Sequence, residues 1–278
     1  MSERPILIAQ ISDLHIKRPG VLAYNRVDTA AALTRCVTEL NRFLPRPDLV
    51  VISGDLADTP TEEEYTHLQS LLAPLAIPFA AVPGNHDDRA LIRAAFPQDG
   101  APTHGPLNLA RAVSELDILL IDSSVPGTNY GVLDPVTLTW LEGTLAASAN
   151  RPALLFLHHP PFATGIAHMD VQNLRNADAL AAVLRRHPRA ILVAAGHVHR
   201  AMFATFAGVA ATICPAPNHA VALDLAARLP PSFNIEPAAF HLHAWFPGPG
   251  FGNVVTHWVP IGGFDGPHPF FGTNGKLL

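Results

Sequence analysis

Short apolar runs alternate with amphipathic stretches along the first two-thirds of the chain. Each run ends at polar residues or at glycine, as buried strands do. The predicted strands are Ile6–Ser12, Leu49–Ser53, Phe79–Val82, Ile118–Ile121, Ala153–Leu157 and Ile191–Ala195. Strands that alternate with helices favour a largely parallel sheet.

The amphipathic stretches between these strands predict helices. In the first, apolar residues recur at helical spacing until Pro45 ends the pattern. Thr61 and Glu64 have the spacing of a capping box, and Asp134 precedes a proline suited to the first helical turn. The predicted helices are Asp28–Leu44, two segments that begin at Thr61 and Asp134, and Asn176–His187.

The pattern changes after residue 200, where apolar strands are separated by turns rich in glycine and proline. We predict antiparallel strands at Met202–Phe206, Ala210–Cys214, Ala220–Leu225, Ala239–Phe246 and Val254–Val259. No linker separates this region, so residues 1–278 are predicted to form a single domain with two layers of sheet and helices outside. Residues 200–278 would supply strands of the second sheet and a C-terminal cap or oligomerisation segment. For the tail 262–278 we favour a packed strap over an oligomerisation arm or a lid.

The composition limits the partners and the cellular compartment that we expect for this protein. The chain has 278 residues, of which 49% are hydrophobic, enough for a substantial core. A net charge of -5 with 18 Lys plus Arg provides no basic surface, so we expect no nucleic-acid or membrane partner. Cys36 and Cys214 suggest no disulfide framework, and the apolar run Ile6–Ile11 is too short for a signal peptide. We therefore expect a cytoplasmic protein.

Polar clusters follow five of the predicted strands. They are Ser12-Asp13-Leu14-His15, Gly54-Asp55, Gly84-Asn85-His86-Asp87, His158-His159-Pro160 and Gly196-His197-Val198-His199. The carboxyl ends of strands in an open parallel sheet line one edge, so these clusters are expected to converge. Histidine, present at 15 positions, is the commonest metal ligand near neutral pH.

These clusters supply the donors of a metal cage. Asp13 with His15, and His197 with His199, lie two residues apart and would point the same way in an extended segment. The full predicted donor set is Asp13, His15, Asp55, Asn85, His158, His197 and His199. If Asp55 bridges with one oxygen on each ion, each of two ions gains four contacts and keeps open positions. Mixed nitrogen and oxygen donors favour Mn, Fe, Co or Zn.

Other polar residues receive simpler interpretations. His241 and His243 alternate within a predicted strand without a nearby carboxylate, so we place them on the surface. Asp58 and Asp122 are assigned capping or turn roles. The loops Arg18–Asn25 and Pro160–Asn173 are candidates for contact with the organic part of a substrate, through Tyr24, Asn25 and His168.

In these clusters the chain resembles the calcineurin-like metallophosphoesterases. Their pattern D-x-H, G-D-x-x-D/N/Y, G-N-H-D/E, H-H/x-P and G-H-x-H is complete and in order between residues 13 and 199. Within that family the chain is similar to the bacterial class III cyclic nucleotide phosphodiesterases and their glycerophosphodiesterase relatives. The stretches that carry this narrower likeness are Ile121-Asp122-Ser123-Ser124 with Gly131, Trp140-Leu141-Glu142, His158-His159-Pro160-Pro161, and Met169-Asp170 with Leu174-Arg175-Asn176.

The resemblance implies an α/β fold, a four-layer αββα sandwich with mixed sheets, and a homo-oligomer, a dimer or larger. It places Asp13, His15, Asp55 and His199 on one metal, and Asp55, Asn85, His158 and His197 on the other. His86 would be catalytic and oriented by Asp87. Asn85, His86 and His219 would bind substrate. One departure from purple acid phosphatases is position 58, which is Asp where they have a metal-binding tyrosine.

The predicted function is hydrolysis of a small phosphodiester by attack of a metal-bridging hydroxide on a dinuclear centre. The leading substrate is a 3′,5′-cyclic nucleotide such as cyclic AMP. The alternatives are a glycerophosphodiester, promiscuous action on phosphomonoesters and phosphodiesters, and a non-enzymatic metal-binding scaffold. Fold alone does not exclude the scaffold, but every donor of the pattern is present.

Overall fold

The computed structural model describes residues 4–148 and 150–278 and contains two large mixed sheets. The first has the order β13-β12-β1-β2-β3 and the second the order β4-β5-β6-β7-β9-β8. The strands are β1 (Ile6–Ile11), β2 (Leu49–Ser53), β3 (Phe79–Val82), β4 (Leu109–Val113), β5 (Leu116–Ile121), β6 (Ala153–Leu157), β7 (Ala190–Ala195), β8 (Met202–Phe206), β9 (Val209–Ile213), β12 (Ala239–Phe246) and β13 (Asn253–Pro260). A short pair, β10 (Ala220–Val221) and β11 (Phe233–Asn234), lies apart from them.

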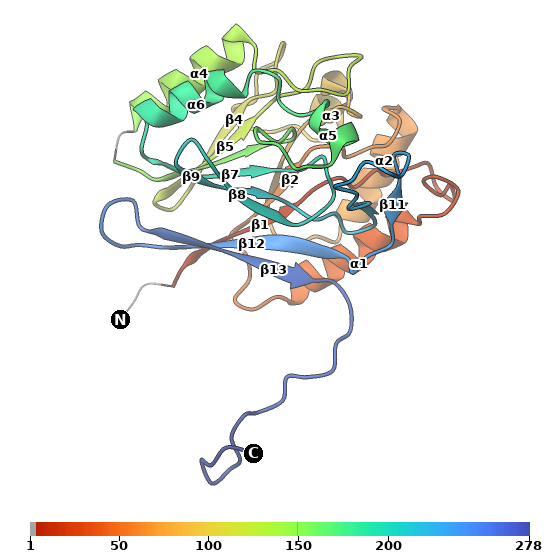
Figure 1. The fold of residues 1–278 in the computed structure, drawn as a ribbon, viewed down its shortest axis with the longest axis vertical. Helices are drawn as coiled ribbons and strands as arrows, with labels where there is room; N and C mark the ends of the chain where they lie inside the picture. The colour runs from red at the N-terminus through yellow and green to blue at the C-terminus, as the bar shows by residue number, and fades with distance from the viewer. Residues whose placement is uncertain (1–3, 149) are drawn as a thin grey trace.

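The helices cover the outer faces of the two sheets (Figure 1). They are α1 (Thr29–Arg42), α2 (Glu62–Leu72), α3 (Arg89–Ala95), α4 (Pro135–Ala147), α5 (Ala167–Asp170) and α6 (Ala177–Arg186). The side chains of Asp28, Thr61 and Asp134 cap α1, α2 and α4 by accepting a backbone N–H bond. Glu64 does not complete the predicted capping box, because its carboxylate accepts from the backbone N–H of Thr59.

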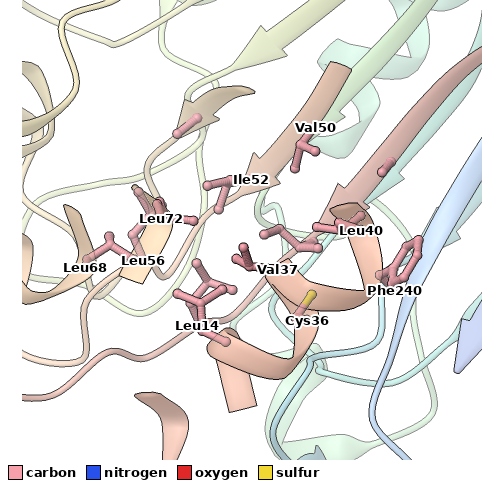
Figure 2. Close-up of a cluster of buried hydrophobic side chains, with 14 of the residues drawn as sticks. Leu14, Cys36, Val37, Leu40, Val50, Ile52, Leu56, Leu68, Leu72 and Phe240 are labelled. Carbon is pink, nitrogen blue, oxygen red and sulfur yellow. The ribbon is translucent and has the colours of Figure 1, made fainter. Parts of the chain in front are cut away.

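Three apolar layers hold the sandwich together. One lies between the first sheet and α1 to α3, a second between the two sheets, and a third between the second sheet and α4 and α6. Figure 2 shows the first layer, where Cys36, Val37 and Leu40 of α1 pack toward Val50 and Ile52 of β2. Central strands are buried on both faces and are therefore continuous apolar runs. The predicted four-layer α/β sandwich is confirmed.

Strands after residue 200 are divided between the two sheets, which differs from the prediction of one antiparallel second sheet. β9 pairs in parallel with β7 and extends the second sheet, whereas β12 pairs antiparallel with β1 and extends the first. Both pairings cover a strand edge that would otherwise stay open. The predicted strand Ala220–Leu225 is reduced to Ala220–Val221.

This arrangement corrects the surface placement of His241 and His243. Both side chains are fully buried, because β12 lies between β1 and β13 and turns this face toward the second sheet. His243 contacts Phe156 of the second sheet with ring centroids 5.7 Å apart. The sequence pattern alone gave no sign that β12 was an interior strand.

The tail Gly262–Leu278 extends away from the body after β13 (Figure 1), so the prediction of a packed strap is wrong. Its large apolar side chains stay exposed, at 79% for Phe270 and 80% for Leu278. A bridge between Phe271 and Leu277 closes a small turn within the tail itself. In the described residues no helix combines the length and apolarity needed to span a membrane.

Candidate metal centre

The five polar clusters meet at one end of the sandwich. Those that follow β1, β2 and β3 come from the first sheet, and those that follow β6 and β7 come from the second. The backbone N–H of His197 donates to both carboxylate oxygens of Asp13, at 2.9 and 3.1 Å, which joins the two sheets at this end. The clusters therefore converge, as expected, but from two sheet edges instead of one.

Left-handed backbone turns the chain at most of the predicted donors. Five of the seven have positive φ: Asp13 (57°), His15 (46°), Asp55 (52°), His197 (74°) and His199 (56°). This conformation costs about 1–3 kcal/mol per non-glycine residue and is concentrated at functional sites. The expectation that the Asp-x-His and His-x-His pairs lie in extended segments is wrong. Their side chains converge because the backbone curls at both members of each pair.

Three glycines make room for the donors. A Cβ atom at Gly54 would collide with the ring of His158, and one at Gly84 would collide with the carboxylate of Asp55. A Cβ at Gly196 would collide with the hydroxyl of Ser12. Only Gly54 of the three also has positive φ, at 98°. Close approach of the strand ends therefore depends on these glycines.

The donors form two groups. In the first, Nε2 of His15 lies 3.2 Å from Nε2 of His199 and 3.5 Å from Oδ2 of Asp55, while Nε2 of His199 lies 3.4 Å from Oδ1 of Asp13. In the second, Nε2 of His158 lies 3.3 Å from Oδ2 of Asp55. The remaining donors of the second group are Oδ1 of Asn85 at 3.2 Å and Nδ1 of His197 at 3.3 Å from the same nitrogen.

Asp55 belongs to both groups through a single oxygen. Its Oδ2 faces His15 and His158, while its Oδ1 accepts the backbone N–H of His86 at 2.9 Å. Asp55 would therefore take part in holding both ions, and the assignment of one carboxylate oxygen to each ion stays a prediction.

The hydrogen bonds of Nδ1 in two of the histidine rings indicate that the donor groups can bind a cation. Nδ1 of His15 lies 3.1 Å from the carboxylate of Asp58, and Nδ1 of His158 lies 2.9 Å from the carbonyl oxygen of Ser53. Both partners accept, so each Nδ1 carries a proton, and each Nε2 presents a lone pair to the centre when its ring is neutral. Lone pairs that face one another across 3.2–3.5 Å require positive charge between them. The residues therefore fit metal ions.

Without metal, burial and the charges of neighbouring donors shift the pKa values of several donor side chains. Burial disfavours the imidazolium of His158, but the carboxylates of Asp55 and Asp13 outweigh it and raise its pKa to about 9. Burial raises the pKa of Asp13 to about 6 although His158 opposes the shift. Burial and then the nearby His158 lower the pKa of His197 to about 3. In the metal-free protein, a proton on His158 thus supplies some of the positive charge that a metal ion would provide.

Asp58 and Asp87 have roles that differ from those predicted. Asp58 fixes the His15 ring and pairs with Lys17 at 2.7 Å instead of capping a turn. The carboxylate of Asp87 accepts the hydroxyl of Tyr65 at 2.8 Å and backbone N–H groups of Leu56, Ala57 and Gly84. The resemblance-based prediction that Asp87 orients His86 is therefore wrong. Asp87 joins the loops that follow β2 and β3.

His86 lies beside the centre with its ring held by the backbone. Its Nδ1 donates to the carbonyl oxygen of Asp58 at 2.8 Å. The ring meets that of His15 edge-on with centroids 4.7 Å apart, and it lines a cavity of about 380 Å³ that opens onto the donors. Nε2 of His86 is therefore the nitrogen available to a molecule in the cavity.

One wall of the cavity, called here the far wall, is largely aromatic and meets the donors at His219, whose ring centroid lies 4.4 Å from that of His199. Tyr24, His219 and Phe233 form it, with centroids 5.0 Å apart for Tyr24 and Phe233 and 5.3 Å for Tyr24 and His219. Asn218 sets the position of His219 by donating to the carbonyl oxygens of Asp13 and Leu14 and accepting the N–H of His219. His219 thus lines the site as the resemblance implied.

The opposite wall comes from the loop between β6 and α6. It includes His168, a predicted contact, together with Met169 and Gln172, while Asn129 joins it from an earlier loop. Sequence reasoning did not name Phe233, Asn129 or Gln172, because none belongs to a motif. Phe233 lies on the two-residue strand β11, Asn129 lies in a loop, and Gln172 lies within the candidate loop Pro160–Asn173. Asn25, proposed as a contact, does not line the cavity. Among the described residues, the lining contains no lysine or arginine.

Comparison with known proteins agrees with this geometry. Residues 6–201 match the family model of the calcineurin-like phosphoesterases. The chain is 38% identical over 275 residues to a probable glycerophosphodiester phosphodiesterase GpdQ of Arcobacter nitrofigilis, covering 98% of this chain and 100% of the relative. It is 37% identical to a cAMP/cGMP dual specificity phosphodiesterase of Mycobacterium tuberculosis, covering 80% and 70%. It is also 32% identical to the 3',5'-cyclic adenosine monophosphate phosphodiesterase CpdA of Escherichia coli, covering 71% of each chain.

Comparison with solved structures agrees with the sequence comparison. A dimetal phosphatase of Danio rerio superposes with a TM-score of 0.65 at 15% identity, covering 94% of this chain and 100% of that structure. The family match spans most of the chain and includes all five polar clusters. The chain therefore belongs to the calcineurin-like phosphoesterase family.

Proposed function

We propose that this protein is a phosphodiesterase whose two groups of donors hold two metal ions. The observation that carries the proposal is that both groups share Oδ2 of Asp55 at their boundary. The first ion would be held by Asp13, His15, Asp55 and His199, and the second by Asp55, Asn85, His158 and His197. Nitrogen and oxygen donors without thiolate favour Mn, Fe, Zn or Co for both positions.

The protein's own groups prepare the site for hydrolysis. Two bound ions would draw charge from the phosphate and activate a water. Asp58 and the carbonyl of Ser53 hold the rings of His15 and His158 with their Nε2 atoms directed inward. His86 can donate from Nε2 only as an imidazolium, because Nδ1 is committed to the carbonyl of Asp58. In that state it serves the leaving oxygen as acid or stabilises a phosphoryl oxygen.

The cavity supports a cyclic nucleotide as the substrate. Its volume of about 380 Å³ lies in the range of small-ligand sites. The aromatic wall of Tyr24, His219 and Phe233 offers ring surfaces on which a planar base can stack. A lining without lysine or arginine among the described residues leaves the phosphate charge to the metal ions. Two relatives are named for cyclic nucleotide hydrolysis.

A glycerophosphodiester is the second candidate. The relative named for this substrate aligns with 98% of the chain, a larger share than the 80% and 71% aligned with the two relatives named for cyclic nucleotides. That alignment includes most of the region after residue 200, which supplies His219 and Phe233 to the cavity. The same wall would then contact a glycerol or alcohol group.

A substrate panel tests both candidates. Metal-loaded protein should hydrolyse cyclic AMP with a higher kcat/KM than glycerophosphocholine, with an aryl phosphodiester and an aryl phosphomonoester as references. The reverse order would assign the glycerophosphodiester. Comparable rates on the diester and monoester references would indicate a promiscuous phosphatase. No turnover on any of the four, with metal bound, would overturn the phosphodiesterase proposal and favour a metal-binding scaffold.

We also propose that the protein forms a homo-oligomer through its C-terminal arm, residues 262–278. The arm exposes the apolar side chains of Phe264, Phe270, Phe271, Leu277 and Leu278. It continues from β13, an edge strand of eight residues with one unpaired side in the described chain. Deleting residues 262–278 should lower the mass measured by light scattering to that of one chain. An unchanged mass would exclude the arm as the interface.

A further inference from the structure

The amide of Gln10 connects the two sheets directly behind the donor groups. Gln10 lies on β1, is fully buried, and faces the second sheet. Its Nε2 donates to the hydroxyl of Ser53 at 2.8 Å and to the carbonyl oxygen of Ala195 at 3.0 Å. Ser53 is the last residue of β2 in the first sheet, and Ala195 is the last residue of β7 in the second. One amide group thus ties together the ends of two strands from different sheets.

Both strand ends lead straight into the proposed metal ligands. Asp55 follows Ser53 after one glycine, and His197 follows Ala195 after one glycine. The carbonyl oxygen of Ser53 also accepts Nδ1 of His158 at 2.9 Å. A shift of either strand end would therefore move ligands of the second proposed ion relative to Asp55.

His243 fixes which way the Gln10 amide points. Nε2 of His243 lies 3.1 Å from Oε1 of Gln10, and Nδ1 lies 2.8 Å from the hydroxyl of Thr256 on β13. The amide oxygen accepts, so Nε2 of His243 carries the proton and Nδ1 accepts from Thr256. With its oxygen committed to His243, the Gln10 amide must direct both N–H bonds to Ser53 and Ala195.

We propose that Gln10, oriented by His243, is a positioning residue that sets the separation of the two metal ions by fixing the ends of β2 and β7. The inference rests on the proposed function only in that the centre holds two ions. Neither residue would touch substrate. Both would act through the ends of β2 and β7, which lead into Asp55 and His197, and through the Ser53 carbonyl that holds the ring of His158.

The neighbouring His241 provides a matched control. It lies on the same strand and face as His243 and is equally buried. It stands directly opposite Gln10 in the strand register. Neither of its ring nitrogens has a hydrogen-bond partner among the described residues, and its ring stacks on Phe203 at 5.4 Å. Replacing His241 removes a buried imidazole without breaking the connection.

The test compares His243→Leu, His243→Gln, Gln10→Leu and His241→Leu, each loaded with Mn²⁺. Binding isotherms give the affinity of each site, and electron paramagnetic resonance gives the exchange coupling between paired ions, which depends on their separation. Gln10→Leu should weaken binding of the second ion by about 10–100-fold, the usual effect of losing a group that supports a ligand. Its coupling should also change. His243→Leu should show the same changes to a smaller degree.

His243→Gln keeps an N–H donor near the position of Nε2 and should restore much of the wild-type coupling. His241→Leu should match wild type in both readouts. Ser53→Ala, which removes one acceptor of the Gln10 amide and keeps the carbonyl for His158, serves if Gln10→Leu does not fold. Ser53→Ala should also change the exchange coupling between the two ions.

Unchanged affinity and coupling in Gln10→Leu, or in Ser53→Ala where the former does not fold, would overturn the inference. Equal losses in His241→Leu and His243→Leu would do the same, because general packing would then explain both. A wild-type protein that binds only one ion would also refute it. These readouts need no substrate. A protein that binds a coupled metal pair yet hydrolyses no phosphodiester would therefore refute the proposed function and leave this inference standing.

Discussion

The two sides of the cavity are built in different ways. The donor side consists of residues that directly follow buried strands, with left-handed backbone at Asp13, Asp55 and His197 and glycines that allow close approach. The far side consists of loops and the short β10–β11 pair, where Tyr24 and Phe233 meet through ring contacts. One side is fixed by two packed sheets, and the other by segments with little regular structure.

From this difference we expect the donor side to determine the rate on every substrate and the far wall to determine which substrate is preferred. The donor groups can keep their geometry only if both sheets keep their relative position, so substitutions there should affect every substrate. The far wall can change without moving the sheets, so substitutions there should affect substrates unequally. Relatives named for different phosphodiesters share the family with this chain, as expected if the wall varies more than the donors.

Asp55→Asn should have the largest effect, because it removes the oxygen shared by both donor groups. Asparagine keeps the shape but loses the negative charge at Oδ2. We expect loss of at least one ion in metal analysis and a fall in kcat of about 10³-fold or more on every substrate. Asp48→Asn, remote from the cavity, is the control. Two retained ions with full activity would show that Asp55 does not bridge.

His86→Ala should come next, with a fall in kcat of about 10²–10⁴-fold and unchanged metal content. The ring lines the cavity but is held by the carbonyl of Asp58 and not by the donors. His86→Gln keeps an N–H donor and should recover part of the rate if His86 stabilises a phosphoryl oxygen. Full activity in His86→Ala would remove this residue from the mechanism. A fall limited to one substrate would show that His86 contributes to substrate preference, as the far wall does, and not to the reaction itself.

The donor side was largely predictable from the sequence, and the physical reason is local. Each donor immediately follows an apolar strand, so the strand pattern and the cluster occur together in the chain. What the sequence could not supply was the division of the clusters between two sheets, because both sheets have the same apolar strand pattern. The left-handed turns at Asp13 and His197 were also missed, since aspartate and histidine adopt extended backbone as readily.

The far wall was predictable only in part. The sequence predicts contacts at Tyr24 and His168 from their loops, and the family resemblance implies His219. Phe233 lies after a loop of irregular sequence, and its place beside Tyr24 depends on how β11 pairs with β10. The burial of His243 depends in the same way on a distant pairing, that of β12 with β1. Contacts set by long-range pairing leave no local pattern.

Metal affinity should depend on pH in a direction set by His158. The carboxylates raise its pKa to about 9 against the effect of burial, so in the metal-free protein this ring binds a proton below that pH. A metal ion must displace the proton. Affinity measured by chelator competition should therefore rise by up to about tenfold per pH unit from pH 6 to pH 9 and then level off. A flat profile would show that no proton is displaced.

Phe233→Ala should have the smallest effect and the most selective one. Loss of a ring that stacks on a base costs about 1–3 kcal/mol, so KM for cyclic AMP should rise by about tenfold or more. Glycerophosphoethanolamine has no aromatic ring, and its KM should change little. Phe203→Ala, which removes an exposed ring outside the cavity, is the matched control. If both substrates lose equally, the wall supports the donor side structurally, and the two sides of the cavity are not independent. If only the glycerophosphodiester is affected, its alcohol group, and not a base, occupies the aromatic wall.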